Sequence, residues 1–285
     1  MSSHVCVLTG EGARGAFQAG LLDYLSEENF GYKLPFTKYI GISSGAITAF
    51  LYSHIEQGAI RQMFLEAKGM GDVFSFSLWT TLFGKGVFRA KPLKKKLSFL
   101  LKNHKKMEEE ITPCVISYCE VSTGQIKYID ISPLSDEEKI KYLVRAVTIP
   151  ALIHPEEENY CDAGVFEINP FSYELIHNKE LESITVVAGK DFKMPDFNEK
   201  RHLFGFIDMA ARALDVIMYS MMMDDFNLLV RSSPEFKHID IKVYCYTGPE
   251  ISAIDFSHSE YLYELAQDLY TLYDKSDIES LPMKE

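Results

Sequence analysis

The sequence contains no uninterrupted apolar run long enough to span a bilayer, so we expect no transmembrane helix. Its first four residues, Met-Ser-Ser-His, form neither a basic segment nor an apolar core, and we expect no signal peptide. Positive charge is in deficit, since 29 Lys and Arg face 41 Asp and Glu. A nucleic-acid partner is not expected, because no general basic excess is available to neutralise phosphates. We therefore expect a cytoplasmic protein whose only membrane contact is peripheral.

Cysteine is also scarce, and its pattern argues against both disulfides and a metal. The five cysteines are odd in number and widely spaced, and no Cys-x-x-Cys motif occurs, so a zinc ribbon is not expected. Their apolar, strand-like surroundings predict reduced, buried thiols at Cys6, Cys114, Cys119, Cys161 and Cys245. We expect no metal and no cofactor.

What the sequence does have is a core-forming composition in which strands alternate with helices. With 47% hydrophobic residues in 285, the chain can bury a large core, and α/β folds of this size often form one unit, so we predict a single domain over 1–285. The pattern predicts an α/β layer fold with a mainly parallel sheet. Expected strands lie near 4–9, 39–42, 111–119, 124–130, 183–188 and 239–246, and expected helices near 16–25, 46–51, 59–67, 136–147, 203–230 and 261–273.

One short stretch joins a strand to a helix through a Gly-x-Ser-x-Gly pentapeptide. The apolar run ending at Ile40 is followed by Gly41, Ser43 and Gly45, and helical spacing resumes at Ala46. Glycines two residues before and after a serine allow a turn so tight that the hydroxyl stands exposed at the end of the strand, facing a helix N-terminus. Ser43 is therefore a candidate nucleophile.

A glycine loop, residues 10–15, follows the first expected strand. Its glycines match Gly-x-Gly-x-x-Gly, which in a dinucleotide-binding unit holds a pyrophosphate, but the second strand here ends in the serine turn rather than in the acidic residue such units need. The same loop can instead serve as an oxyanion hole, in which backbone N–H groups point at a developing negative oxygen. A tight turn without a ligand is the structural alternative. The residues are Gly10, Glu11, Gly12, Ala13, Arg14 and Gly15.

A single carboxylate, Asp162, stands in a turn with two small residues, Ala163 and Gly164. Small neighbours let the aspartate approach another loop. Taken alone, the aspartate is more simply interpreted as capping its own backbone, as aspartates in turns commonly do.

In this order, the glycine loop, the serine pentapeptide and Asp162-Ala163-Gly164 resemble the patatin-like phospholipase family. The resemblance covers roughly residues 4–190, and includes the stretch 145–151, Pro155 and the stretch 165–170. It implies a three-layer fold with helices on both sides of the sheet, with 191–285 completing the domain. It also implies a Ser-Asp dyad in which Ser43 attacks an ester carbonyl and Asp162 is the base, with a phospholipid or related glycerolipid as substrate.

Two residues depart from the family's pattern. Glu11 occupies the second of three glycines, where a carboxylate near an oxyanion would be unfavourable unless it points away, and Arg14 is available to offset it. Ala163 replaces a glycine, which requires a negative φ there.

A rival within the hydrolases stays open beside this function, as do two functions of other classes: a nucleotide-binding oxidoreductase that would use Gly10, Gly12 and Gly15, and a silent lipid-binding module. A Ser-His-Asp esterase would combine Ser43 and Asp162 with one of four histidines, His177, His202, His238 or His258. A catalytically silent lipid-binding module is consistent with the departures at Glu11 and Ala163.

Residues 74–106 suggest peripheral contact with an anionic membrane. Residues 74–88 are aromatic, and 89–106 carry eight basic residues and no acidic one, with leucines on the opposite helical face. A basic amphipathic helix beside an aromatic loop is typical of a membrane-docking surface, although charged runs are more often simply solvated faces.

Overall fold

The computed structural model describes residues 2–30, 33–77, 81, 86–167, 169–192, 213, 216–217, 219–224 and 237–280. Within these residues the main sheet has eight strands, in the order β10-β9-β8-β1-β2-β5-β6 with β7 paired to β5. The five central strands run parallel to one another: β9 (Asp240–Tyr246), β8 (Leu181–Ala188), β1 (Ser3–Leu8), β2 (Lys38–Gly41) and β5 (Cys114–Glu120). Three antiparallel strands complete it: β10 (Tyr270–Asp274), β6 (Gln125–Asp130) and β7 (Tyr160–Cys161).

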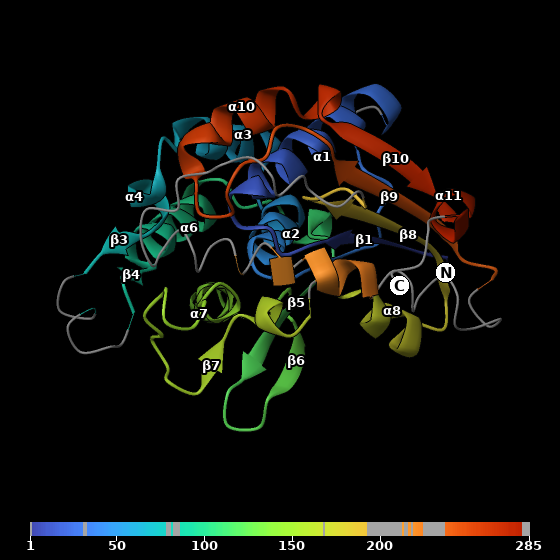
Figure 1. Ribbon diagram of the computed structural model, residues 1–285. Coiled ribbons are helices and arrows are strands. Elements are labelled where there is room, and N and C mark those ends of the chain that lie inside the picture. Colours follow the sequence, from blue (N-terminus) through green and yellow to red (C-terminus); the bar gives the residue numbers. More distant parts are fainter. Residues whose placement is uncertain are drawn as a thin grey trace.

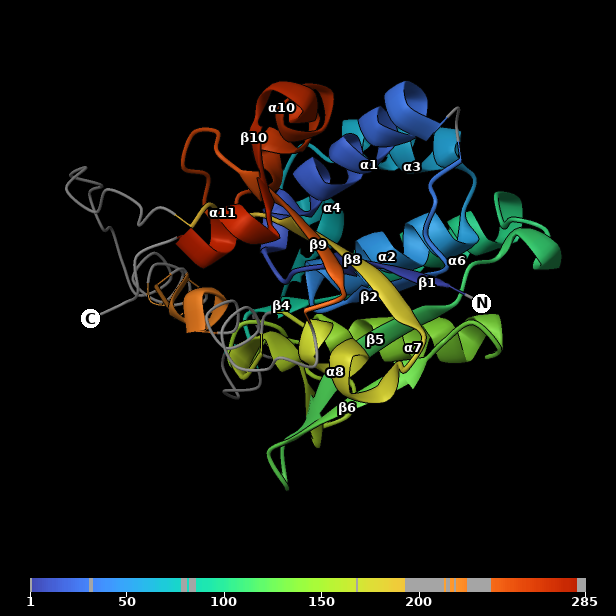
Figure 2. The same ribbon diagram turned by 90° about the vertical axis from the view of Figure 1, so that its right-hand side faces the viewer.

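Helices cover both faces of this sheet, as Figure 1 and the rotated view in Figure 2 show. On one side are α1 (Gly15–Phe30), α2 (Ser44–His54), α3 (Gln57–Glu66) and α10 (Ser259–Glu264). On the other side are α8 (Phe171–His177) and α11 (Lys275–Ser280). The remaining helices are α4 (Met70–Val73), α6 (Lys91–Asn103), α7 (Asp136–Ala146) and the short 3-10 helices at Gly12–Arg14, Glu108–Glu110, Ala163–Val165, Phe256–His258 and Ala266–Asp268. The fold is the expected three-layer α/β arrangement.

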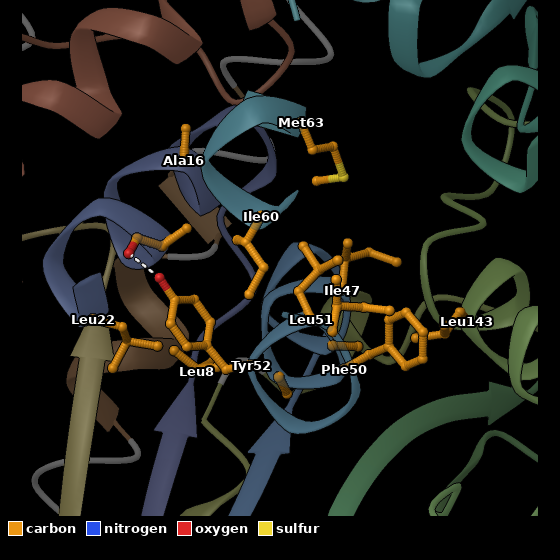
Figure 3. Packing of buried hydrophobic residues seen from close by; sticks show 14 of the residues in the cluster. Leu8, Ala16, Leu22, Ile47, Phe50, Leu51, Tyr52, Ile60, Met63 and Leu143 are labelled. Atoms are coloured by element: carbon orange, nitrogen blue, oxygen red, sulfur yellow. Dashed lines mark hydrogen bonds between the residues drawn. The ribbon is translucent and has the colours of Figure 1, made fainter. Parts of the chain in front are cut away.

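Strand β1 shows how alternation produces two cores. Cys6 and Leu8 face the core shared with α1 and α2, whereas Val5 and Val7 face the core beneath α8, because successive side chains on a strand point to opposite faces. Figure 3 shows the larger core, where Leu8, Leu51 and Ile60 lie among buried side chains from neighbouring elements.

Several sequence predictions are confirmed. The strands predicted on either side of residue 122 are β5 and β6. Ser135 caps α7, and Glu138 completes a capping box through its bonds to the amide and hydroxyl of Ser135. The five cysteines are buried and free of disulfides.

The predicted C-terminal helix over 261–273 is wrong in its second half. The helix stops at Glu264, and Tyr270–Asp274 pairs with β9 as an antiparallel edge strand. Leucines and tyrosines in this stretch fit either periodicity, and the unpaired edge of β9 decides for the strand, because its backbone groups need partners. The predicted helix over 203–230 lies mostly outside the described residues, although Met222 and Met223 are buried in the core beneath the sheet.

A small two-stranded sheet, β3 (Ser75–Phe76) with β4 (Phe88–Arg89), lies in the aromatic stretch predicted as a loop. Part of that stretch, including Trp79, is outside the described residues. Among the described residues, no helix combines the length and apolarity needed to cross a bilayer.

Candidate active site

Ser43 occupies the turn between β2 and α2 in a strained backbone conformation, with φ 54° and ψ −125°. Such a conformation is rare for a residue with a side chain and is found where the surrounding structure enforces it. The two flanking glycines explain how the turn holds Ser43 in this conformation. A Cβ at Gly41 would lie 2.2 Å from the carbonyl oxygen of Gly45, and one at Gly45 would lie 2.2 Å from that of Leu8. The close approach of β1, β2 and α2 therefore requires glycine at both positions and sets the serine at the N-terminus of α2.

The structure brings Asp162 to this serine. The Ser43 hydroxyl donates a hydrogen bond of 2.5 Å to Oδ2 of Asp162. The other carboxylate oxygen, Oδ1, accepts one of 2.7 Å from the Gly164 amide, and the amide of Asp162 donates to the carbonyl of Thr148 at 2.9 Å. Asp162 thus caps its own turn with one carboxylate oxygen, as its sequence context alone suggested. Its other carboxylate oxygen accepts the hydrogen bond from Ser43.

Burial sets the electrostatics of this carboxylate. Asp162 is 2% exposed, and loss of hydration raises its pKa from 3.8 to about 7, although the hydrogen bonds from Ser43 and Gly164 oppose the rise. A pKa near neutrality suits a general base at physiological pH. Ala163, where the family has glycine, keeps a negative φ and is fully buried, so this departure is accommodated without strain.

The glycine loop packs directly against the serine. A Cβ at Gly10 would lie 3.0 Å from Cβ of Ser43. Two loop amides are engaged elsewhere: Glu11 donates to Oγ of Ser44 at 3.0 Å, and Ala13 to the carbonyl of Ala253 at 2.7 Å. The amides of Arg14 and Gly15 bond within the loop. Across the described ranges, the amides of Gly10 and Gly12 find no protein acceptor.

Glu11 is turned away from the serine. Its carboxylate is buried and receives a hydrogen bond of 3.2 Å from Nη1 of Arg14 and a longer one of 3.5 Å from the Thr9 hydroxyl. Its Cγ lies against Gly189 at the end of β8, where a Cβ on that glycine would be 2.6 Å away. The ion pair with Arg14 supplies the charge partner that a buried carboxylate needs.

An apolar pocket opens at Ser43. Its empty volume is about 890 Å³, including the part that is open to solvent. Side chains of α2, α3, α4 and α6 form much of its wall, together with residues 147–153. Among the described lining residues the only charged side chains are Asp72 and Lys96, and both are held by main-chain groups of their own surroundings. An apolar pocket lined by a serine that is bonded to a carboxylate fits an acyl chain.

The described histidines lie elsewhere. His177 is exposed on α8 and its Nδ1 contacts the carbonyl oxygen of Tyr173 at 2.8 Å, while His258 lies 3.2 Å from Asp255. His238 is exposed before β9, and His202 is outside the described residues. No histidine of the described ranges lines the pocket at Ser43.

Residues after 191 contribute to the pocket, which the sequence motifs did not predict. Ala253, Ile254, Phe256 and Ser259 all line the pocket, although the sequence motifs end near 190. No residue-type signal marks them, because apolar and small side chains carry no chemistry of their own.

The family of the chain follows from a comparison with known proteins. No curated protein sequence matches the chain. Among solved structures, the crystal structure of VipD from Legionella pneumophila matches with a TM-score of 0.44 and 12% sequence identity, covering 96% of this chain and 68% of that chain. The family described as patatin-like phospholipase matches residues 6–175, more than half of the sequence. The chain therefore belongs to the patatin-like phospholipase family, and it is a lipid acyl hydrolase.

Proposed function

We propose that this protein hydrolyses carboxylic ester bonds of phospholipids or related glycerolipids through a Ser43–Asp162 dyad. The observation that carries the proposal is the 2.5 Å hydrogen bond to a buried carboxylate from a serine that has a strained backbone and lines an apolar pocket. Each of the two residues has a role that its surroundings support.

In the first half of the reaction, the Ser43 oxygen attacks the ester carbonyl as its proton passes to Asp162. The carbonyl oxygen becomes negative, and the amides of Gly10 and Gly12 are the proposed donors that stabilise it. The tetrahedral intermediate collapses when the protonated Asp162 gives its proton to the leaving alcohol. The acyl group is then bound to Ser43.

In the second half, water replaces the alcohol. Asp162 takes a proton from the water, which attacks the acyl carbonyl and forms a second tetrahedral intermediate. Its collapse releases the fatty acid and returns the proton to Ser43. The cycle needs no cofactor. Residues of both 4–190 and 191–285 line the pocket, and this supports the proposal of one domain over 1–285.

Lipid product profiling tests this function most directly. Mixed phospholipids and neutral glycerides are incubated with wild type and with Ser43→Ala, and released fatty acids and lysolipids are identified. We expect products from wild type alone, and their headgroups and acyl positions name the substrate. A silent lipid-binding module would release nothing from either protein and would leave Ser43 unlabelled by an organophosphonate.

We also propose that α6 carries peripheral contact with an anionic membrane. One face of this helix lines the pocket through Leu93 and Lys96. The opposite stripe, spaced by four, four and three residues, consists of exposed Lys91, Lys95, Phe99 and Lys102, and Phe99 is 57% exposed. This stripe would set the pocket near a lipid surface.

The basic residues of 89–106 do not contribute equally to that contact. Lys94 is paired with Glu156 at 2.8 Å and Lys105 with Asp136 at 3.1 Å. Lys96 donates to the carbonyl of Met63 at 3.4 Å. The proposed surface is therefore the exposed stripe, and Lys94, Lys96 and Lys105 are not part of it.

A further inference from the structure

The segment from Ile251 to Phe256, called here the C-terminal wall, touches the glycine loop at two points. The Ala13 amide donates to the carbonyl of Ala253 at 2.7 Å, and Nε of Arg14 donates to the carbonyl of Ile251 at 3.2 Å. These contacts join residues about 240 positions apart in sequence, and the wall lies beyond the segment 6–175 that matches the family.

The wall also fits closely against Gly12. This glycine has φ +58°, and a Cβ there would lie 2.0 Å from the carbonyl oxygen of Ala253. Only glycine permits both that conformation and that approach. The position of the loop amides beside Ser43 is therefore fixed in part by the C-terminal wall.

The same segment closes one side of the pocket. Ile254 and Phe256 line it and are half-buried. The ring of Phe256 packs edge-to-face on Phe74, with centroids 6.0 Å apart and planes at 67°. Phe74 lines the pocket from the other side, between α4 and β3, so the two rings meet where the C-terminal wall joins the rest of the pocket wall.

We infer that the C-terminal wall determines acyl-chain specificity, with Ile254 and Phe256 contacting the chain beyond the ester while the carbonyls of Ile251 and Ala253 position the glycine loop. The inference rests on the proposed function, since it assigns the chain that the pocket takes. On this assignment, a short acyl group bound at Ser43 makes no contact with these side chains, whereas a long one lies against them.

The test compares nitrophenyl acetate with nitrophenyl laurate. For Phe256→Ala we expect kcat/KM on laurate to fall roughly tenfold, chiefly through KM, while kcat on acetate stays within about twofold, because a lost apolar contact affects only the chain that reaches it. The matched control is Ile176→Ala, an exposed apolar side chain of α8 on the other side of the sheet, which should leave the laurate to acetate ratio unchanged. Circular dichroism checks the fold of each variant.

A second variant, Ile254→Trp, tests the wall by filling space instead of removing it. Laurate turnover should fall while acetate turnover persists. Equal changes on both esters, or an unchanged ratio in both variants, would overturn the inference while leaving the proposed function standing. Absence of acetate turnover in wild type, with no organophosphonate label on Ser43, would instead reject the proposed function itself.

Discussion

The hydroxyl of Ser43 and Oδ2 of Asp162 are 2.5 Å apart, although 119 positions separate the two residues in sequence. The serine is held by the glycines of its turn, and the aspartate by the amide of Gly164 and the carbonyl of Thr148. Both groups are thus placed by the backbone, and the pair is assembled without a histidine from the described residues.

Removing either group should remove activity. Ser43→Ala lacks the nucleophile, and Asp162→Asn keeps the shape but cannot take a proton, so we expect each to reduce kcat by at least about 10³-fold. Hydrolysis of a chromogenic ester measures the loss, and circular dichroism shows whether the fold is kept. Substantial activity in folded Asp162→Asn would exclude the carboxylate as the base.

The raised pKa of Asp162 predicts the pH profile. With its pKa near 7, the base is protonated at lower pH, so kcat/KM should rise with pH through about 7 and level off above it. Below that point the decline should approach tenfold per pH unit. If kcat/KM does not change between about pH 5 and pH 8, a group other than Asp162 is the base.

The same shift predicts a cost in stability. Because the folded-state pKa is above the unfolded value of 3.8, the native state binds more protons between the two values, and stability contributed by Asp162 is lost as pH rises from about 4 through 7. Asp162→Asn should therefore have a larger free energy of unfolding than wild type at pH 8, by up to about 4 kcal/mol, because the pKa rises from 3.8 to about 7. The difference should shrink toward pH 4. Thermal unfolding at both pH values measures it.

Two glycines in helices should respond oppositely to alanine. At Gly45 in α2, a Cβ would lie 2.2 Å from the Leu8 carbonyl oxygen, so Gly45→Ala should destabilise by about 3 kcal/mol and abolish activity. At exposed Gly58 in α3, a Cβ meets nothing within 4 Å, so Gly58→Ala should stabilise by about 0.5–1 kcal/mol with activity kept. Denaturant unfolding compares them. Equal effects at both sites would mean that the turn at Ser43 tolerates displacement.

Histidine should be dispensable for the chemistry. We expect each of four variants to keep kcat/KM on a chromogenic ester within about threefold of wild type: His177→Ala, His202→Ala, His238→Ala and His258→Ala. Removal of a catalytic base would instead lower kcat/KM by about 10²-fold or more. His258 is the most informative of these, since it lies beside Asp255, one residue from Phe256 of the pocket wall. A hundredfold loss at any one of them would restore the triad hypothesis.

Membrane binding should depend on the exposed lysines of α6. Neutralising Lys91, Lys95 and Lys102 to glutamine should weaken binding to anionic vesicles by at least tenfold, at about 1 kcal/mol per lysine, and the remaining binding should depend less on salt. The control neutralises Lys94, Lys105 and Lys106, which changes the net charge equally but removes lysines already bound within the protein. Equal weakening in both variants would indicate a general charge effect, and no weakening in either would remove the membrane proposal.

Much of the fold could be predicted because the signals are local. Apolar runs and helical spacing located β1, β5, β6 and α7, and the Ser135–Glu138 capping box marked the start of a helix. The edge strand β10 could not be separated from a helix in the same way, since its place depends on pairing with β9, thirty residues earlier in sequence.

The candidate site likewise has a part that the sequence predicted and a part that only the tertiary structure decided. The sequence by itself determined the candidate residues, because the Gly-x-Ser-x-Gly turn and the glycine loop need particular residue types at fixed spacing, and the Asp162 turn completes the resemblance to the family. Only the tertiary structure decided that Asp162 bonds to Ser43 as well as to its own turn, and that Ala253 and Phe256 complete the pocket. These are contacts between distant segments, and their energy comes from burial and packing, which no local pattern records.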